Sequence, residues 1–340
     1  MRQIWIPKAG APEVLEVREA PDPSPAPGEV RIRVAATGIN FADIAARLGT
    51  YQDCPPMPVV VGYEVAGTVD AVGSGVDGSF EGREVLALTH FGGYCDVVCT
   101  PVAQVFDRPD GMDAKTGAAI PVNYITAWQL VVAMGGLKAG ETVLIHSAGG
   151  GVGVAVTQLA KNIGATVIGT ASAGKHDFIR GTGVDHCIDY RTEDFAKRVQ
   201  EITNGKGVEL ALDAVGGPSF AQSYDSLSPT GRLGMFGVSA GTTGKDPNRL
   251  GFLKAVLQMP WLKFHPPALM NANKGVFGVN LGRMWHEVER LRPWMESIVG
   301  LWNDGVVKPV ISKTFPFSEA AAAHHYIQDR KNQGKVLLEP

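Results

Sequence analysis

A glycine-rich segment at residues 142–153 constrains the fold of this chain more than any other stretch. It begins with the apolar, β-branched run Thr142-Val143-Leu144-Ile145, passes through a glycine cluster and continues into a helix-forming segment, 154–163. This order of strand, glycine turn and helix suits a pyrophosphate, because small residues let the backbone approach the phosphates and free helix N–H groups face the negative charge. The spacing Ala148-x-Gly150-x-x-Gly153 is the dinucleotide-binding fingerprint with alanine in its first place. A tight turn without a ligand remains the alternative, since the chain has 42 glycines.

Length and composition limit the class of protein. At 340 residues the chain is long for one core, and we expect two domains. A hydrophobic content of 45% and a charged content of 19% fit a soluble globular protein, and the net charge of −3 gives no reason to expect a nucleic acid partner. No apolar run is long enough for an integral membrane segment, and residues 1–7 resemble a first strand rather than a signal peptide.

The cysteines indicate a reducing compartment. Cys54, Cys95, Cys99 and Cys187 are too few and too scattered for a disulfide framework, so we expect a cytoplasmic location. The pair Cys95-x-x-x-Cys99 could hold half of a metal site, but no second pair completes four ligands, which favours two residues of one strand.

The pattern of apolar residues predicts a fold of the α/β class with two domains. Short strands at 29–36, 59–61, 64–72 and 84–88, separated by glycine turns, indicate a small, partly closed β-barrel. From about residue 112 the pattern changes, with helices at 114–120 and 125–134 separated by Pro121. Strands then alternate with helices as in a doubly wound parallel sheet. The strands are expected at 141–147, 166–171, 186–190, 208–214, 231–238 and 275–280, and the helices at 151–163, 174–182, 193–203, 218–227 and 283–303.

The end of the chain returns to a strand, a helix and a strand, at 311–317, 318–331 and 335–338. This tail is too short to fold alone, so we expect it to pack on the barrel. The predicted domains are therefore 1–122 with 305–340 for the barrel, and 123–304 for the Rossmann dinucleotide-binding domain.

The second strand of the parallel sheet indicates which nicotinamide cofactor the chain binds. An acidic residue at its end would accept hydrogen bonds from the ribose 2′-OH and repel a 2′-phosphate. Here Ser172 and Lys175 occupy that region, and Tyr190 and Arg191 end the next strand. A lysine at a helix start favours a phosphate, which predicts NADP(H). In the alternative interpretation Lys175 is an ordinary exposed helix residue.

Several motifs along the whole chain carry a family resemblance. They are Gly38-Ile39-Asn40-Phe41-Ala42-Asp43, Gly62-Tyr63-Glu64-Val65-Ala66-Gly67, Ala148 to Gly153, and Gly334-Lys335-Val336-Leu337-Leu338. With them the chain resembles the medium-chain dehydrogenase/reductase superfamily, and within it the zinc-independent quinone oxidoreductases. The stretches 122–127, 169–176 and 264–266 are similar to the branch of the vesicle amine transport protein homologs. The resemblance implies a GroES-like barrel as the catalytic domain.

The resemblance also implies chemistry without zinc. Zinc-dependent relatives carry a cysteine and a histidine ligand where this chain has Asn40 and Tyr63, and neither asparagine nor tyrosine is a usual zinc ligand. No metal is therefore expected. Reduced nicotinamide can still donate hydride to quinones or α,β-unsaturated carbonyls, because their charge delocalises onto an oxygen that the protein hydrogen-bonds.

The resemblance assigns roles to individual residues. Asn40 and Tyr51 would line the pocket near the nicotinamide and donate hydrogen bonds to the acceptor oxygen, with Tyr63 close to the same cleft. Each has a structural alternative, as a strand-end amide or a packing residue. The expected cofactor contacts are Asn123, Thr126, Ala148, Gly149, Gly150, Gly151, Val152, Gly153, Ser172, Lys175, Tyr190, Arg191, Gly237, Val238, Gly334 and Lys335.

One apolar segment, 246–273, departs from a compact reductase. It could cover the sheet or a dimer interface, form a lid over the substrate, or make peripheral contact with lipid. The alternative function is therefore an NADPH-binding lipid-transfer or redox-sensing protein with little turnover. We also expect a homodimer, because the strand at 274–280 could pair across a two-fold axis.

Overall fold

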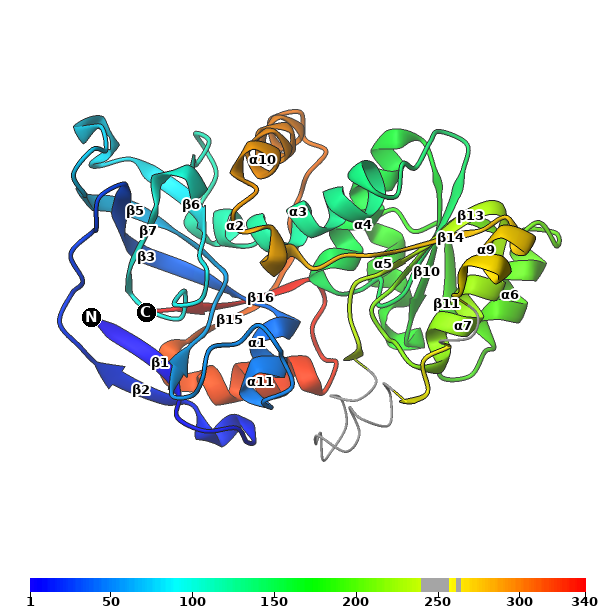
Figure 1. Cartoon of the computed structure of the whole chain (residues 1–340), viewed down its shortest axis with the longest axis horizontal. Helices are drawn as coiled ribbons and strands as arrows, with labels where there is room; N and C mark the ends of the chain where they lie inside the picture. Colours follow the sequence, from blue (N-terminus) through cyan, green and yellow to red (C-terminus); the bar gives the residue numbers. More distant parts are fainter. Residues whose placement is uncertain (240–256, 261–263) are drawn as a thin grey trace. The chain divides into compact units, whose positions relative to one another are not determined.

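The computed structural model describes residues 1–239, 257–260 and 264–340 (Figure 1). The chain forms two compact units. The first unit comprises Met1–Ile125, Leu281–Asp304 and Pro309–Pro340, and the second comprises Thr126–Asn280 with Gly305–Lys308. Residues 281–304, which the sequence analysis assigned to the dinucleotide-binding domain, thus group with the first unit. The predicted α/β class with its parallel sheet is confirmed.

The first unit contains two β-sheets, and β3 (Glu29–Ile39) lies at the centre of the larger one. Its neighbours are β5 (Glu64–Val72) and β16 (Lys335–Glu339), both antiparallel to it. Along β3, Val30, Ile32 and Val34 are buried in the barrel core, as the alternation of apolar residues predicts. The remaining strands of this sheet are β6 (Glu84–Leu88), β7 (Val97–Pro101), β8 (Val105–Asp107) and β15 (Ile311–Pro316), and the small sheet is β2 (Glu16–Glu19), β1 (Arg2–Ile6) and β4 (Val59–Val60).

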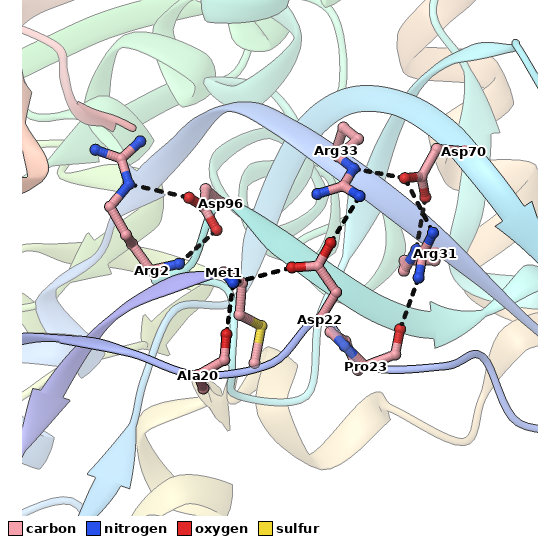
Figure 2. A network of polar contacts seen from close by, with 9 residues as sticks. All are labelled: Met1, Arg2, Ala20, Asp22, Pro23, Arg31, Arg33, Asp70 and Asp96. Atoms are coloured by element: carbon pink, nitrogen blue, oxygen red, sulfur yellow. Dashed lines mark hydrogen bonds and ion pairs between the residues drawn. The ribbon is translucent and has the colours of Figure 1, made fainter.

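The opposite face of β3 carries arginines that hold the Pro-rich connector between β2 and β3, residues 21–28. Figure 2 shows Arg31 and Arg33 pointing to Asp70 of β5, with the Arg31 Nε to Asp70 Oδ1 distance at 2.8 Å. Arg33 also pairs with Asp22 at 2.7 Å, and Arg31 donates to the carbonyl of Pro23. The connector is therefore fixed to the sheet by ion pairs, although it has no regular secondary structure.

Most helices of the first unit are short, and α10 (Val288–Asn303) is the exception with 16 residues. The short ones are α1 (Phe41–Arg47), α2 (Ala114–Ala118) and α11 (Ala320–Gln328), and α3 (Pro121–Trp128) crosses the boundary between the units. Pro121 begins α3 instead of separating two helices, since proline suits the first turn. The predicted helix at 125–134 is therefore shifted, and residues 129–133 form a π-helical turn. The predicted helix at 283–303 is divided into a 3-10 turn, Leu281–Met284, and α10.

The second unit is a sheet of six parallel strands in the order β11-β10-β9-β12-β13-β14 (Figure 1). Numbered along the chain, this is the order 3-2-1-4-5-6 of a Rossmann fold. The strands are β9 (Thr142–Ile145), β10 (Thr166–Ala171), β11 (His186–Asp189), β12 (Val208–Asp213), β13 (Leu227–Met235) and β14 (Gly275–Gly278). The helices between them are α4 (Gly151–Ile163), α5 (His176–Gly181), α6 (Phe195–Ile202) and α7 (Pro218–Asp225).

Part of the predicted apolar segment 246–273 lies outside the described residues, namely 246–256 and 261–263. The described part forms α9 (Pro266–Ala272), and Phe264 packs edge-on against Tyr224 with ring centroids 5.5 Å apart. At least this part of the segment therefore covers the sheet of the second unit, where Met259 and Leu269 also pack.

A buried polar chain joins α1 to α11 in the first unit. Arg47 is fully buried, and its Nε lies 3.3 Å from His324 Nδ1. Since a guanidinium can only donate, Nδ1 accepts, and the ring proton resides on Nε2, 3.2 Å from the hydroxyl of Tyr94. Tyr94 in turn hydrogen-bonds Asp43. Burial lowers the pKa of His324 to about 3, so this imidazole is neutral in the folded protein.

This neutral histidine predicts a loss of stability in acid. The unfolded chain binds a proton at His324 below pH 6.5 and the folded chain does not until about pH 3, so the stabilisation falls as the pH decreases through that window. Between pH 6.5 and 5 the free energy of unfolding should decrease by about 2 kcal/mol more in the wild type than in His324→Gln. Reversible denaturant unfolding would measure this difference. His265→Gln, at an exposed position, is the control; equal pH dependence of wild type and His324→Gln would contradict the assignment.

Candidate functional site

The glycine turn of the second unit lies between β9 and α4. Gly150 is the N-cap of α4 and has no side chain to satisfy the first free N–H groups of this 13-residue helix. A Cβ on Gly153 would lie 2.5 Å from the carbonyl oxygen of Ser147, so only glycine lets the helix approach the turn this closely. A Cβ on Gly150 would meet nothing nearer than 3.4 Å. The turn therefore offers backbone N–H groups at a helix N-terminus, which suits an anion.

Lys175 lies beside this turn. It follows β10 and Ser172, and a Cβ on Gly149 would be 3.3 Å from Lys175 Cδ. The structure therefore brings together Lys175 and the fingerprint residues Ala148, Gly149, Gly150, Gly151, Val152 and Gly153. Tyr190 and Arg191 follow β11, which pairs with β10 in parallel, and the Arg191 guanidinium lies 6.0 Å from the Tyr190 ring centroid. These groups share the carboxyl edge of the sheet, where such folds bind nucleotides.

A buried hydrogen-bond network supports this edge of the sheet, and sequence reasoning missed it. His146 follows β9, Asp213 ends β12, and Ser223 connects them: its hydroxyl lies 2.7 Å from Asp213 Oδ2 and 2.9 Å from His146 Nε2. Asp213 also accepts N–H groups from Val215 and Gly216. The signal in the sequence was a polar residue at the end of a buried strand, as at His146 and Asp213. The residue that connects them, Ser223, is distant from His146 in sequence.

The loop after β13 packs on the loop after β12. A Cβ on Gly237 would lie 3.0 Å from the carbonyl oxygen of Ala214, and a Cβ on Gly216 would lie 2.9 Å from Val238 Cγ1. The two predicted contacts Gly237 and Val238 are thus close to the Asp213 loop. Their role toward the nicotinamide stays a prediction.

In the first unit, Asn40 belongs to a buried polar cluster with Glu64 and Lys335. The Lys335 ammonium lies 2.6 Å from Asn40 Oδ1 and 2.5 Å from Glu64 Oε1, and Asn40 Nδ2 lies 3.0 Å from that same carboxylate oxygen. Glu64 Oε2 accepts the N–H of Val122 in the first turn of α3 at 2.7 Å. Sequence reasoning named Asn40 and Lys335 separately, one for catalysis and one for the cofactor, and the structure places them in contact.

Asp43 is a fully buried carboxyl group that adjoins this cluster at Asn40. It accepts the backbone N–H groups of Asn40 at 2.7 Å and of Gly62 at 2.9 Å. Burial raises the pKa of Asp43 to about 7, against the opposing effect of these hydrogen bonds. Its contacts fix the ends of β3 and of the loop before β5, which is the structural role that a carboxylate at a helix start can have.

Tyr51 and Tyr63 lie in an aromatic cluster, formed with Phe91, His90 and Trp285. The Tyr63 ring is 6.2 Å from Tyr51 and 5.2 Å from Phe91, and His90 stacks on Trp285 at 5.1 Å. Tyr63 is 8% exposed, yet its hydroxyl has no hydrogen-bond partner among the described residues. Burial raises the pKa of Tyr51 to about 12 and that of Tyr63 further, so both hydroxyls keep their protons and can donate. The cluster therefore forms an apolar surface in which the Tyr63 hydroxyl is a donor without a partner among the described residues.

The other predicted contacts are less informative. Asn123 and Thr126 are buried on α3, where the Asn123 amide donates to the carbonyl of Ala119 at 3.3 Å. Gly334 has a positive φ of 92°, and a Cβ there would lie 2.2 Å from the carbonyl oxygen of Val310, so glycine is required by the fold. Their contact with a cofactor stays a prediction.

The described part of the chain contains neither a metal-binding cluster nor a membrane-spanning helix. Within residues 1–239, 257–260 and 264–340, no three His, Cys, Asp or Glu side chains gather as a metal site would need. Of the helices described there, none is both long and apolar enough to cross a membrane.

Comparisons with known proteins agree with both units. The alcohol dehydrogenase GroES-like domain family matches residues 26–132, and the zinc-binding dehydrogenase family matches residues 182–338. The synaptic vesicle membrane protein VAT-1 homolog of Rattus norvegicus is 40% identical over 329 residues, 96% of this chain and 80% of that protein. A 2-haloacrylate reductase of a Burkholderia species is 33% identical over 98% of each chain. The structure of Escherichia coli quinone oxidoreductase complexed with NADPH is 32% identical, with a TM-score of 0.87 over 100% of both chains.

The close approach at Gly153 predicts a specific loss of stability. Gly153→Ala should destabilise the protein by about 1–3 kcal/mol, because the new methyl group meets backbone atoms that cannot rotate away. Thermal unfolding would measure the change. Gly174→Ala, where a Cβ would contact nothing within 4 Å, is the control and should leave the midpoint nearly unchanged. A wild-type midpoint in Gly153→Ala would show that the turn has room.

Proposed function

Because the chain belongs to the medium-chain dehydrogenase/reductase superfamily, in the branch of the VAT-1 homologs, we propose that it reduces quinones or α,β-unsaturated carbonyls with NADPH. It is an oxidoreductase of that superfamily, and its cofactor is NADP(H). The observation that carries the substrate proposal is the buried Tyr63 hydroxyl, which has no partner within the described residues and lies in an aromatic wall.

The cofactor fits the carboxyl edge of the second unit. The N–H groups at residues 149–153 would hold its pyrophosphate, and Ser172 and Lys175, with Tyr190 and Arg191, would hold the adenosine ribose and its 2′-phosphate. When bound, its nicotinamide supplies a hydride. Asn123, Thr126, Gly237 and Val238 are proposed to contact that ring.

The first unit would stabilise the acceptor. A quinone or enone oxygen gains negative charge as hydride arrives at its conjugated carbon, and donors already aimed at that oxygen lower the barrier. Tyr63 and Tyr51 have protonated hydroxyls, and the amide of Asn40 has one N–H beyond the one given to Glu64. These three groups would bind the oxygen, and the aromatic rings would exclude water and bind a planar acceptor.

The same cluster argues for chemistry without zinc. Asn40 Oδ1 accepts a hydrogen bond from the Lys335 ammonium at 2.6 Å, so the one oxygen that this side chain could offer to a cation is already occupied. Tyr63, where zinc-dependent relatives carry histidine, keeps its proton and cannot supply an anionic ligand.

A lipid-transfer or sensing role is the second candidate. The relatives of the VAT-1 branch are named as vesicle membrane proteins, and Met270 on α9 is 78% exposed. The cytoplasmic location, the homodimer and any peripheral lipid contact stay predictions.

Oxidation of NADPH and NADH by chelator-treated protein tests the proposed function. A panel of quinones and enones should be reduced with NADPH, and chelation should leave the rate unchanged. NADPH binding with no turnover on any acceptor would reject the reductase and favour the second candidate.

Lys175 predicts the preference for the phosphorylated cofactor. Lys175→Ala should raise the KM for NADPH about 10–100-fold, because one charge-assisted phosphate contact is lost, and should change the KM for NADH little. The exposed Lys197→Ala on α6 is the control. An equal effect on both cofactors would refute a 2′-phosphate contact.

Tyr63 predicts a loss of turnover without a loss of fold. Tyr63→Phe breaks no hydrogen bond given by the described residues, so the thermal midpoint should not decrease, while kcat should fall about 10²-fold as one oxyanion donor is lost. Tyr224, in the second unit, also has a buried hydroxyl without a described partner, so Tyr224→Phe is a matched control that should keep full kcat. Unchanged kcat in Tyr63→Phe would remove Tyr63 from the mechanism.

A further inference from the structure

Asn40, Glu64 and Lys335 meet because of strand register. β3 lies between β5 and β16, with Thr37 opposite Val65 and Ile39 opposite Val336. Glu64 begins β5, Lys335 begins β16, and Asn40 follows β3, so all three residues emerge at one end of the sheet. A Cβ on Gly38 would lie 2.3 Å from Glu64 Oε1 and 2.6 Å from Lys335 Cε. The absent side chain of Gly38 therefore makes the space in which the carboxylate and the ammonium meet.

The two charges fix which way the Asn40 amide points. An ammonium only donates and a carboxylate only accepts, so the oxygen of the amide must face Lys335 and its nitrogen must face Glu64. The contacts Oδ1 to Nζ at 2.6 Å, Nζ to Oε1 at 2.5 Å and Oε1 to Nδ2 at 3.0 Å close a ring along one edge of the amide. The N–H on the side of Oδ1 is consumed in this ring, and the second N–H points away from it.

These contacts use two of the three N–H groups of the Lys335 ammonium, with Asn40 Oδ1 and Glu64 Oε1 as the acceptors. Lys335 is 3% exposed and Glu64 is fully buried, with its other oxygen occupied by the N–H of Val122. The ammonium is neutralised by Glu64 within this cluster. The two charges act in opposite senses on the donor strength of the remaining Asn40 N–H, so what they supply together is a fixed orientation of the amide.

We propose that Lys335 and Glu64 are positioning residues that orient the Asn40 amide, so that its outward N–H donates to the oxygen of the acceptor. This inference rests on the proposed reductase function, in which Asn40 touches that oxygen. The expected contact of Lys335 with the cofactor stays a prediction beside it.

The test removes both charges together, so that no unpaired charge stays buried. In Glu64→Gln/Lys335→Met the amide keeps an uncharged partner, and kcat with a quinone should fall about tenfold while the Kd for NADPH, measured by fluorescence titration, changes less than about twofold. Lys115 of α2 and Glu339 of β16 form an exposed ion pair at 2.8 Å. The matched control Lys115→Met/Glu339→Gln should leave both quantities unchanged.

A comparison in the Asn40→Ala background separates positioning from a general structural role. If Lys335 and Glu64 act through Asn40, removing them there should cause little further loss of kcat. If Glu64→Gln/Lys335→Met lowers kcat by the same factor in the Asn40→Ala background as in the wild type, the inference is overturned. A tenfold rise in the Kd for NADPH with kcat preserved would also overturn it. Failure of the wild type to reduce any acceptor would overturn the proposed function and this inference with it, whereas the same factor in both backgrounds of an active enzyme would overturn the inference alone.

Discussion

The buried ion pair between Glu64 and Lys335 is the interaction on which the first unit depends. It joins the first residue of β5 to the first residue of β16 across the central strand, although 271 positions separate them (335 minus 64). Two charges removed from water are costly unless geometry and further hydrogen bonds compensate them. Here the compensation comes from Asn40, from the N–H of Val122 and from the space at Gly38. The pair therefore selects one register of β16 on β3, because a slip of one residue would separate the charges.

The two units position their functional groups in different ways. In the second unit, glycines allow backbone groups to approach one another, and a carboxylate with four donors, Asp213, fixes the loops that follow the central strands. In the first unit, the Tyr63 hydroxyl is one of three buried side-chain groups with an atom that has no hydrogen-bond partner among the described residues, together with Gln104 and Arg108. A polar atom left without a partner is expensive in a core. The Tyr63 hydroxyl lies in the aromatic cluster with Tyr51 and Phe91, where an acceptor oxygen could complete its hydrogen bonding.

Local patterns predicted most of the elements. The strands at 64–72, 84–88 and 166–171 and the helix at 151–163 have the predicted bounds, because alternation, helix-forming runs and glycine turns lie within each segment. The strand predicted at 231–238 begins earlier, at Leu227, since Pro229 and Gly231 look like a turn in sequence but form an irregularity within β13. The helix predicted at 125–134 was shifted for a similar reason, because Pro121 serves as a helix start.

The candidate site was predictable in part. Asn40, Tyr51 and Tyr63 were named through motifs, yet nothing in the sequence connects Asn40 to Lys335 or Tyr94 to His324. Such contacts depend on how distant strands align. That alignment also has a consequence for biosynthesis. All of the second unit and most of the first leave the ribosome before residue 335, and until then Glu64 lacks the cation that makes its burial tolerable. The pairing of β16 with β3 can therefore form only after all the other described strands have been synthesised.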